Sequence, residues 1–78
     1  MLVDIITPDA QLFSGEVLSV ELPGTNGSFE ILNDHAPIIS TLTAGEVTIS
    51  LDKGQKESFK INGGVIEMQN NKIIVLAD

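Results

Sequence analysis

The sequence predicts an all-β domain, folded as a two-sheet β-sandwich of about nine to ten short strands. Two observations carry this prediction: apolar and polar residues alternate with period two along most of the chain, and turn-forming residues recur at short intervals between the alternating segments. No segment shows a sustained helical period. Strands separated by turns every 8 to 12 residues, roughly, are typical of a sandwich or a barrel.

The alternation is clearest in two segments. Leu18, Val20 and Leu22 alternate with polar residues, and residues 47–51 repeat the pattern. Each apolar set is expected to lie on one face of a half-buried strand. The last segment, residues 72–77, is apolar on both faces, which predicts a central strand with neighbours on both sides.

Turn chemistry separates the strands. Proline, glycine and asparagine residues mark four turns, at residues 7–9, 26–27, 52–54 and 70–71. The pair Gly63–Gly64 predicts a bulge or a point where another backbone, of the same domain or of a partner, approaches closely. Strands are therefore expected near residues 2–7, 10–14, 16–22, 28–32, 38–43, 46–51, 56–61, 64–69 and 72–77.

Composition limits the function. The 78 residues are expected to form one soluble domain, residues 1–78, in which four lysines and no arginine oppose eleven acidic residues for a net charge of −7. Without clustered cations, we expect neither nucleic-acid binding nor direct binding to anionic lipid headgroups. The absence of cysteine excludes disulfides and thiolate metal sites. No apolar run approaches the roughly 18 residues of a spanning helix, so no membrane insertion is expected.

Catalytic groups are scarce. His35 is the only histidine, and Asp34 beside it suggests a triad with one of the serines. Adjacent residues of an extended chain point to opposite faces, so Asp34 is badly placed to orient the imidazole. The alternative is a structured loop in which Asn33 or Asp34 bonds nearby amides and Pro37 fixes the exit into the next strand. One histidine with scattered carboxylates holds no metal, and we expect no cofactor.

Four motifs occur in the order typical of one family. Residues 27–47, GSFEILNDHAPIISTLTAGEV, resemble the signature of the epsilon subunit of F-type ATP synthase: a glycine-bounded strand, a His-Ala-Pro turn, an apolar strand and a glycine before the next strand. Residues 12–15 (LFSG), 62–67 (NGGVIE) and 75–78 (VLAD) resemble three further stretches of that family. The resemblance covers the whole chain and implies the family's two-sheet N-terminal sandwich.

The resemblance also implies a function. Such a subunit catalyses nothing; it is a rotor subunit of the central stalk that couples the gamma subunit to the c ring of the proton-translocating synthase during ATP synthesis, and it is monomeric within the complex. By similarity, the gamma subunit is expected to contact His35, Ala36 and Pro37. The c ring is expected to contact a second set of residues: Thr25, Asn26, Gly27, Ser28 and Glu30. The implied location is peripheral, at the cytoplasmic face of a bacterial inner membrane, with an organelle inner membrane or a thylakoid membrane as alternatives.

The chain departs from the family in two respects. Many relatives carry an acidic residue after the glycine of the c-ring turn, whereas this chain has Ser28 there and Glu30 two positions later. Many relatives also continue into two C-terminal helices that restrain rotation or bind ATP, whereas this sequence ends at Asp78. Inhibition by those helices is therefore not expected of this chain.

Two other functions are compatible with parts of the sequence. A free-standing β-sandwich module for a sugar or other small ligand needs aromatic rings or a concave polar pocket, and the chain offers only Phe13, Phe29 and Phe59. A small hydrolase would depend on His35. Replacing His35 by alanine distinguishes the hydrolase from the stalk subunit, because the enzyme would lose turnover and the stalk subunit would lose assembly.

Overall fold

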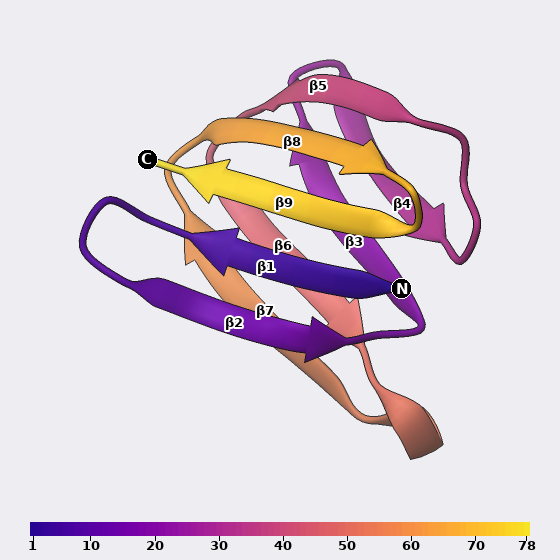
Figure 1. Cartoon of the computed structure of the whole chain (residues 1–78). Helices are drawn as coiled ribbons and strands as arrows, with labels where there is room; N and C mark the ends of the chain where they lie inside the picture. Colours follow the sequence, from indigo (N-terminus) through magenta and orange to yellow (C-terminus); the bar gives the residue numbers. More distant parts are fainter.

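Nine strands build almost the whole protein. The computed structural model describes all 78 residues, Met1–Asp78, and its strands form two layers (Figure 1). A short 3-10 turn, η1 (Asp52–Gly54), is the only other regular element. The strands are β1 (Leu2–Ile6), β2 (Gln11–Glu16), β3 (Ser19–Gly24), β4 (Gly27–Leu32), β5 (Ile38–Leu42), β6 (Gly45–Ser50), β7 (Lys56–Ile61), β8 (Gly64–Gln69) and β9 (Lys72–Ala77).

Hydrogen bonds join the strands in the order β2-β1-β9-β8-β5-β3-β6-β7, with β4 paired to β3. Only one residue pair, Gly24 with Leu42, links β5 to β3, so the ladder bends there into two sheets. The front sheet of Figure 1 is β2-β1-β9-β8-β5, and the back sheet holds β4, β3, β6 and β7. The two-sheet sandwich that the sequence predicts is confirmed, and β9 is a central strand, parallel to β1 and antiparallel to β8.

Aliphatic side chains from both sheets fill the space between them. Because successive residues of a strand face opposite sides, every second residue is buried, as Val3 and Ile5 are in β1. Full burial of each such side chain contributes about 1.5–3 kcal/mol. At the open seam, where β2 and β7 share no hydrogen bonds, the rings of Phe13 and Phe59 lie 5.9 Å apart between centroids and close the core.

The strand boundaries differ most between β2 and β3. The sequence predicts strands at 10–14 and 16–22, but β2 continues through Gly15 to Glu16 and β3 begins only at Ser19. The chain turns a corner at Val17 and Leu18, whose amides donate to the carbonyls of Met1 and Ser50 at 2.9 and 2.8 Å. Leu18 therefore lies outside the strand and is 60% exposed. Its predicted place on the buried face is wrong.

Two turn predictions gain detail from the backbone. Asn70 and Asn71 adopt positive φ, at 54° and 60°, as predicted. The tight hairpin predicted at Asn26–Gly27 is centred one residue earlier, because Thr25 and Asn26 form the turn and Gly27, with φ 121°, opens β4. Gly64 has φ 147°, and a Cβ there would overlap the Leu76 carbonyl oxygen. The close approach predicted for this glycine pair is thus internal to the domain.

Candidate functional site

The loop between β4 and β5 exposes the His-Ala-Pro sequence. Asp34 takes a positive φ of 61°, which reverses the chain, and the amide of His35 donates to the Leu32 carbonyl at 3.2 Å. The imidazole Nδ1–H donates to the carbonyl of Ala36 at 2.7 Å. His35, Ala36 and Pro37 are all exposed. The loop therefore presents three neighbouring side chains on a defined backbone.

Asn71 holds this loop in place. Its side-chain oxygen accepts the amide of Asp34 at 2.8 Å, and its side-chain nitrogen donates to Asn33 Oδ1 at 3.0 Å. The α-ammonium of Met1 donates to the same oxygen at 3.1 Å. The predicted loop is ordered, but not by the predicted bonds to nearby amides: Asn33 Oδ1 accepts from the remote groups of Asn71 and Met1. Asn71, from the β8–β9 turn, is an anchor that sequence reasoning missed. No local signal identifies it, because it lies 38 positions from Asn33 along the chain.

The same geometry does not form a catalytic triad. The His35 ring bonds a backbone carbonyl rather than a carboxylate, and the amide of Asp34 is bound by Asn71. The serine hydroxyls with side-chain partners bond elsewhere: Ser14 to Asp4 and Ser58 to Thr48. A nucleophile, a base and an orienting carboxylate are thus not brought together.

Four of the five predicted c-ring residues gather at the tip of the β3–β4 hairpin: Thr25, Asn26, Gly27 and Ser28. Thr25 is braced by β5: its amide donates to the Thr41 carbonyl at 3.3 Å, and the two threonine hydroxyls lie 3.0 Å apart. Thr43 donates its amide to Pro23 at 2.8 Å, so the β5–β6 turn joins the same polar end. Sequence reasoning missed Thr41 and Thr43. The signal was present in the run Ser40-Thr41-Leu42-Thr43, in which three of four residues carry a hydroxyl group at the end of a strand.

Glu30 lies further along β4, on the outer face of the back sheet. It is exposed and pairs across the strands with Glu21, which is also exposed. Like charges directly opposite each other are unfavourable in a sheet. Glu30 shares the outward side of β4 with Ser28, two residues away.

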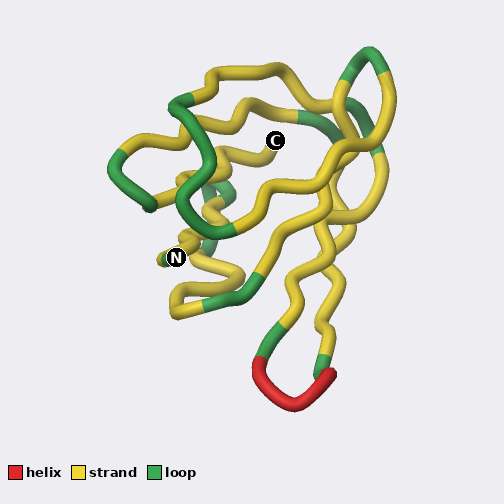
Figure 2. The backbone as a smooth tube through the Cα atoms, turned by 90° about the vertical axis from the view of Figure 1, so that its right-hand side faces the viewer, coloured by secondary structure: helices red, strands yellow, loops and turns green.

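The structure keeps the two predicted contact regions apart. The Thr25–Asn26 turn precedes β4 and the His35 loop follows it, so the six residues of β4 separate them. At about 3.3 Å per residue this is on the order of 20 Å. Figure 2 shows the β3–β4 turn at the upper right and the loop before β5 nearer the middle of the view, at the two ends of β4. Two partners can therefore bind the domain without overlapping.

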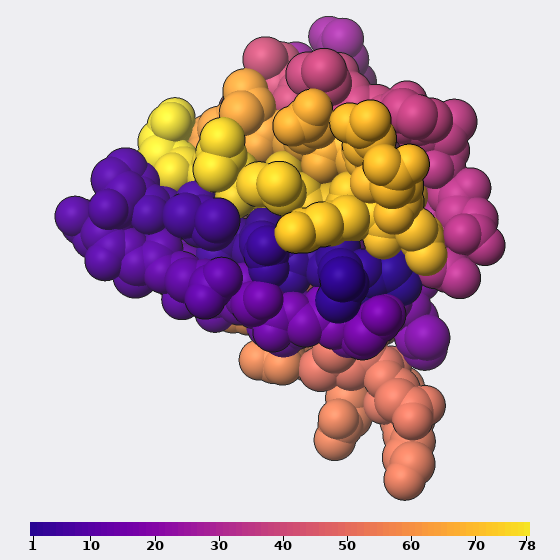
Figure 3. All heavy atoms as spheres, viewed as in Figure 1, coloured from indigo at the N-terminus to yellow at the C-terminus, as the bar shows by residue number.

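The outer face of the front sheet is an unexpected apolar surface. Neighbouring strands place Ile6, Leu76 and Val65 in one row, while Ile74 and Ile39 flank Glu67 in the next. Ile39 is 78% exposed and Leu76 50%. This group, Ile6, Ile39, Val65, Ile74 and Leu76, is called the apolar face below, and Figure 3 views the sheet from this side. Exposed apolar groups of this kind mark interaction sites in many soluble proteins.

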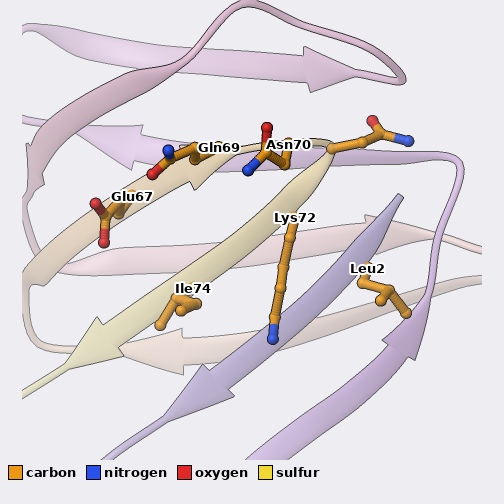
Figure 4. Close-up of a pocket in the computed structure, with 7 residues that line it drawn as sticks. Leu2, Glu67, Gln69, Asn70, Lys72 and Ile74 are labelled. Carbon is orange, nitrogen blue, oxygen red and sulfur yellow. The ribbon is translucent and has the colours of Figure 1, made fainter.

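A shallow hollow adjoins the apolar face. Its volume is about 390 Å³, and Glu67, Lys72 and Ile74 are among the side chains that line it (Figure 4). The Lys72 ammonium lies 3.9 Å from the carboxylate of Asp4. No phenylalanine lines the hollow, because Phe13 and Phe59 pack together at the seam and Phe29 packs against the core. The aromatic rings expected of a sugar-binding module are therefore engaged elsewhere.

Comparison with known proteins identifies the family. Residues 1–78 match the family model described as the ATP synthase, Delta/Epsilon chain, beta-sandwich domain. The chain belongs to this family. The resemblance to an epsilon subunit, which rests on the four motifs, is thereby confirmed. This epsilon-type chain is a structural subunit of ATP synthase rather than its catalytic one.

Curated relatives support the assignment. The chain is 45% identical over 75 residues to the ATP synthase epsilon chain of Chlorobium limicola and 44% identical to that of Chlorobaculum tepidum, covering 96% of this chain and 85% of each relative. It is 42% identical over 74 residues to the epsilon chain of Dichelobacter nodosus, but spans only 52% of that protein. The relatives therefore include both short and long epsilon chains.

Solved structures share the fold at lower identity. A chain of the Euglena gracilis mitochondrial ATP synthase, solved with OSCP, F1 and c ring, superposes with a TM-score of 0.89 at 17% identity. A chain of the Tetrahymena thermophila mitochondrial ATP synthase central stalk and c ring superposes with a TM-score of 0.82 at 17% identity. The epsilon-type chain spans 48% and 61% of these two chains. None of its helical segments has the length and apolarity to cross a membrane.

Proposed function

We propose that this epsilon-type chain joins the gamma subunit of ATP synthase to the c ring and transmits rotation between them as part of the central stalk. The observation that carries the proposal is the separation of two unlike contact regions by the length of β4 on one packed sandwich. A rigid body with two distant binding regions can transmit force between two partners. Binding residues are commonly carried on loops that a rigid scaffold positions.

The gamma subunit is assigned to the His35 loop and the adjoining apolar face. Pro37, Ile38 and Ile39 line a second hollow with Glu67, which makes the loop and the face one continuous surface. The fully buried core of an interface is more apolar than its polar rim, so an exposed apolar group suits such a core. Asn71 adds rigidity, since a loop that is already ordered loses less entropy on binding.

The c ring is assigned to the polar tip, where Thr25, Asn26, Gly27 and Ser28 are exposed, together with Glu30. Hydroxyl, amide and backbone groups at such a tip suit polar loops of a partner. The domain would then attach peripherally through the ring, and we propose the cytoplasmic face of a bacterial inner membrane as its location. The domain boundary, residues 1–78, is part of the same proposal.

Single-cysteine cross-linking tests both assignments, because the chain has no cysteine of its own. In the assembled complex we expect His35→Cys to cross-link to gamma and Ser28→Cys to cross-link to subunit c. Ser58→Cys, on β7 of the back sheet, is the matched exposed control and is expected to cross-link to neither. Cross-linking of His35→Cys to subunit c, or of Ser28→Cys to gamma, would overturn the assignment.

A further inference from the structure

Two Asn-Gly pairs occur in the chain, and the fold surrounds them differently. Asn26 and Gly27 are both exposed at the tip of the β3–β4 hairpin, beside the free edge of β4. A Cβ built on Gly27 would meet no atom within 4 Å. The peptide between Asn26 and Gly27 is therefore accessible to water and has room to rearrange.

In the second pair, Asn62–Gly63, the asparagine is exposed but the glycine is enclosed. Gly63 is buried, and its carbonyl accepts the amide of Asp78 at 3.0 Å. A Cβ built on Gly63 would lie 3.0 Å from the Asp78 carboxylate and 3.4 Å from the Leu42 carbonyl oxygen. A nearby carboxylate disfavours the loss of a proton from the Gly63 amide, because a second negative charge would form beside the first.

We infer that Asn26 is a site of spontaneous deamidation and that the fold protects Asn62. The backbone nitrogen of Gly27 loses its proton and attacks Cγ of Asn26, so that a nitrogen–carbon bond forms and a five-membered succinimide closes. The Cγ–Nδ2 bond breaks, and Nδ2 takes up a proton and leaves as ammonia. Water then opens either carbonyl of the ring and yields aspartate or isoaspartate. Glycine favours the attack because it carries no side chain to obstruct the approach.

The modification changes the hairpin tip in two ways. Either product adds one negative charge to a chain whose net charge is already −7. Isoaspartate also lengthens the main chain by one carbon inside a two-residue turn, and the turn sets the register of β3 against β4. This consequence rests on the proposed function: since the tip is assigned to the c ring, deamidation is expected to weaken binding to the ring as the protein ages.

Peptide mapping tests the inference without any partner. Cleavage after glutamate isolates Asn26 in residues 22–30 and Asn62 in residues 58–67, because Glu21, Glu30, Glu57 and Glu67 flank the two pairs. After incubation of the folded protein, we expect a gain of about one dalton on the Asn26 peptide, faster at higher pH, and a several-fold slower gain on the Asn62 peptide. Isoaspartate is counted by enzymatic methylation. In the denatured chain the two pairs should react at similar rates.

Two variants sharpen this test. Asn26→Gln should abolish the gain on its peptide, whereas Asn62→Gln should leave the gain at Asn26 unchanged. Equal rates at the two pairs in the folded protein, or no gain at Asn26, would overturn the inference.

The consequence for binding is measured separately: aged wild-type protein should bind isolated c ring more weakly than fresh protein, while aged and fresh Asn26→Gln bind alike. Unchanged binding of the aged wild type would remove that consequence and leave the cross-linking test of the c-ring assignment standing.

Discussion

The two outer faces of the sandwich differ in chemistry although the same alternation builds both sheets. The front sheet exposes Ile39, Val65 and Leu76, whereas the corresponding face of the back sheet exposes Glu21 and Glu30. Burial between the sheets is similar on both sides, with fully buried aliphatic residues in β1, β3, β6, β8 and β9. The difference teaches that the inward-facing residues of each strand make the sandwich, whereas the outward-facing residues set the chemistry of the surface that each sheet exposes.

The largest expected effect separates the inner and outer sides of one strand. Ile73→Ala in β9 removes a fully buried side chain and should lower the free energy of unfolding by about 2–5 kcal/mol. Leu76→Ala, on the outer side of the same strand, should change it by less than about 0.5 kcal/mol, because its side chain is half exposed. Urea denaturation measures both. A large loss of stability in Leu76→Ala would mean that the outer side also carries the fold.

The second prediction tests the apolar face as an interface. Ile39→Asp should weaken binding to purified gamma by about tenfold or more, because it places a charge in a region that binding desolvates. Thr48→Asp, on the outer side of the back sheet, is the matched control and should leave gamma binding unchanged. Titration calorimetry with each folded variant gives the affinities. An equal loss of gamma affinity in both variants would mean that the two outer faces do not differ in gamma binding.

The third prediction concerns the anchor of the His35 loop. Asn71→Gly removes the side chain but keeps the freedom to adopt positive φ, so it tests the hydrogen bonds to Asp34 and Asn33 alone. We expect a loss of about 1 kcal/mol in stability and weaker gamma binding.

Asn70→Gly is the matched control for this anchor. It also changes a positive-φ asparagine, at φ 54°, in the same turn. Its unfolding midpoint and gamma affinity should stay close to those of the wild type. Similar losses in the two glycine variants would show that the turn backbone matters and the Asn71 side chain does not.

The smallest expected effect concerns the acidic outer face of the back sheet. Glu21→Gln removes one charge from the exposed pair with Glu30, and relief of that repulsion should raise stability by about 0.2–1 kcal/mol at low salt. The gain should shrink at high ionic strength, because salt screens exposed charges. Denaturation at two salt concentrations checks it. A gain that does not depend on salt would exclude repulsion as its cause.

Sequence reasoning predicts the strands well because period-two alternation directly reports a half-buried sheet. All nine predicted strands are present, and the positive-φ turn at Asn70–Asn71 follows from residue type. The corner at Val17–Leu18 could not be predicted, since it depends on bonds to Met1 and Ser50 that only the folded chain brings near.

The candidate site is harder to predict from the sequence than the strands are. The exposure of His35, Ala36 and Pro37 follows from a loop signal, but their anchor, Asn71, is remote in sequence. The doubly apolar β9 indicates a strand covered on both sides, yet the pattern does not distinguish a covering layer of the same chain from a partner. Leu76 shows this: it is half exposed, and its partners on the adjacent strands are Ile6, which is partly buried, and Val65, which is exposed.

The position of the two contact regions at opposite ends of β4 has a mechanical consequence. With gamma at the His35 loop and the c ring at the Thr25 tip, a load between the partners runs parallel to β3 and β4. Both attachment points then lie at the two ends of one strand, so the covalent backbone of β4 carries the load, while its pairing with β3, from Ser19–Leu32 to Gly24–Gly27, keeps the strand extended. A pull at right angles to β4 would instead load the hydrogen bonds between β3 and β4 one after another. In the proposed arrangement, the orientation of β4 thus makes the domain stiff along the line between its two partners.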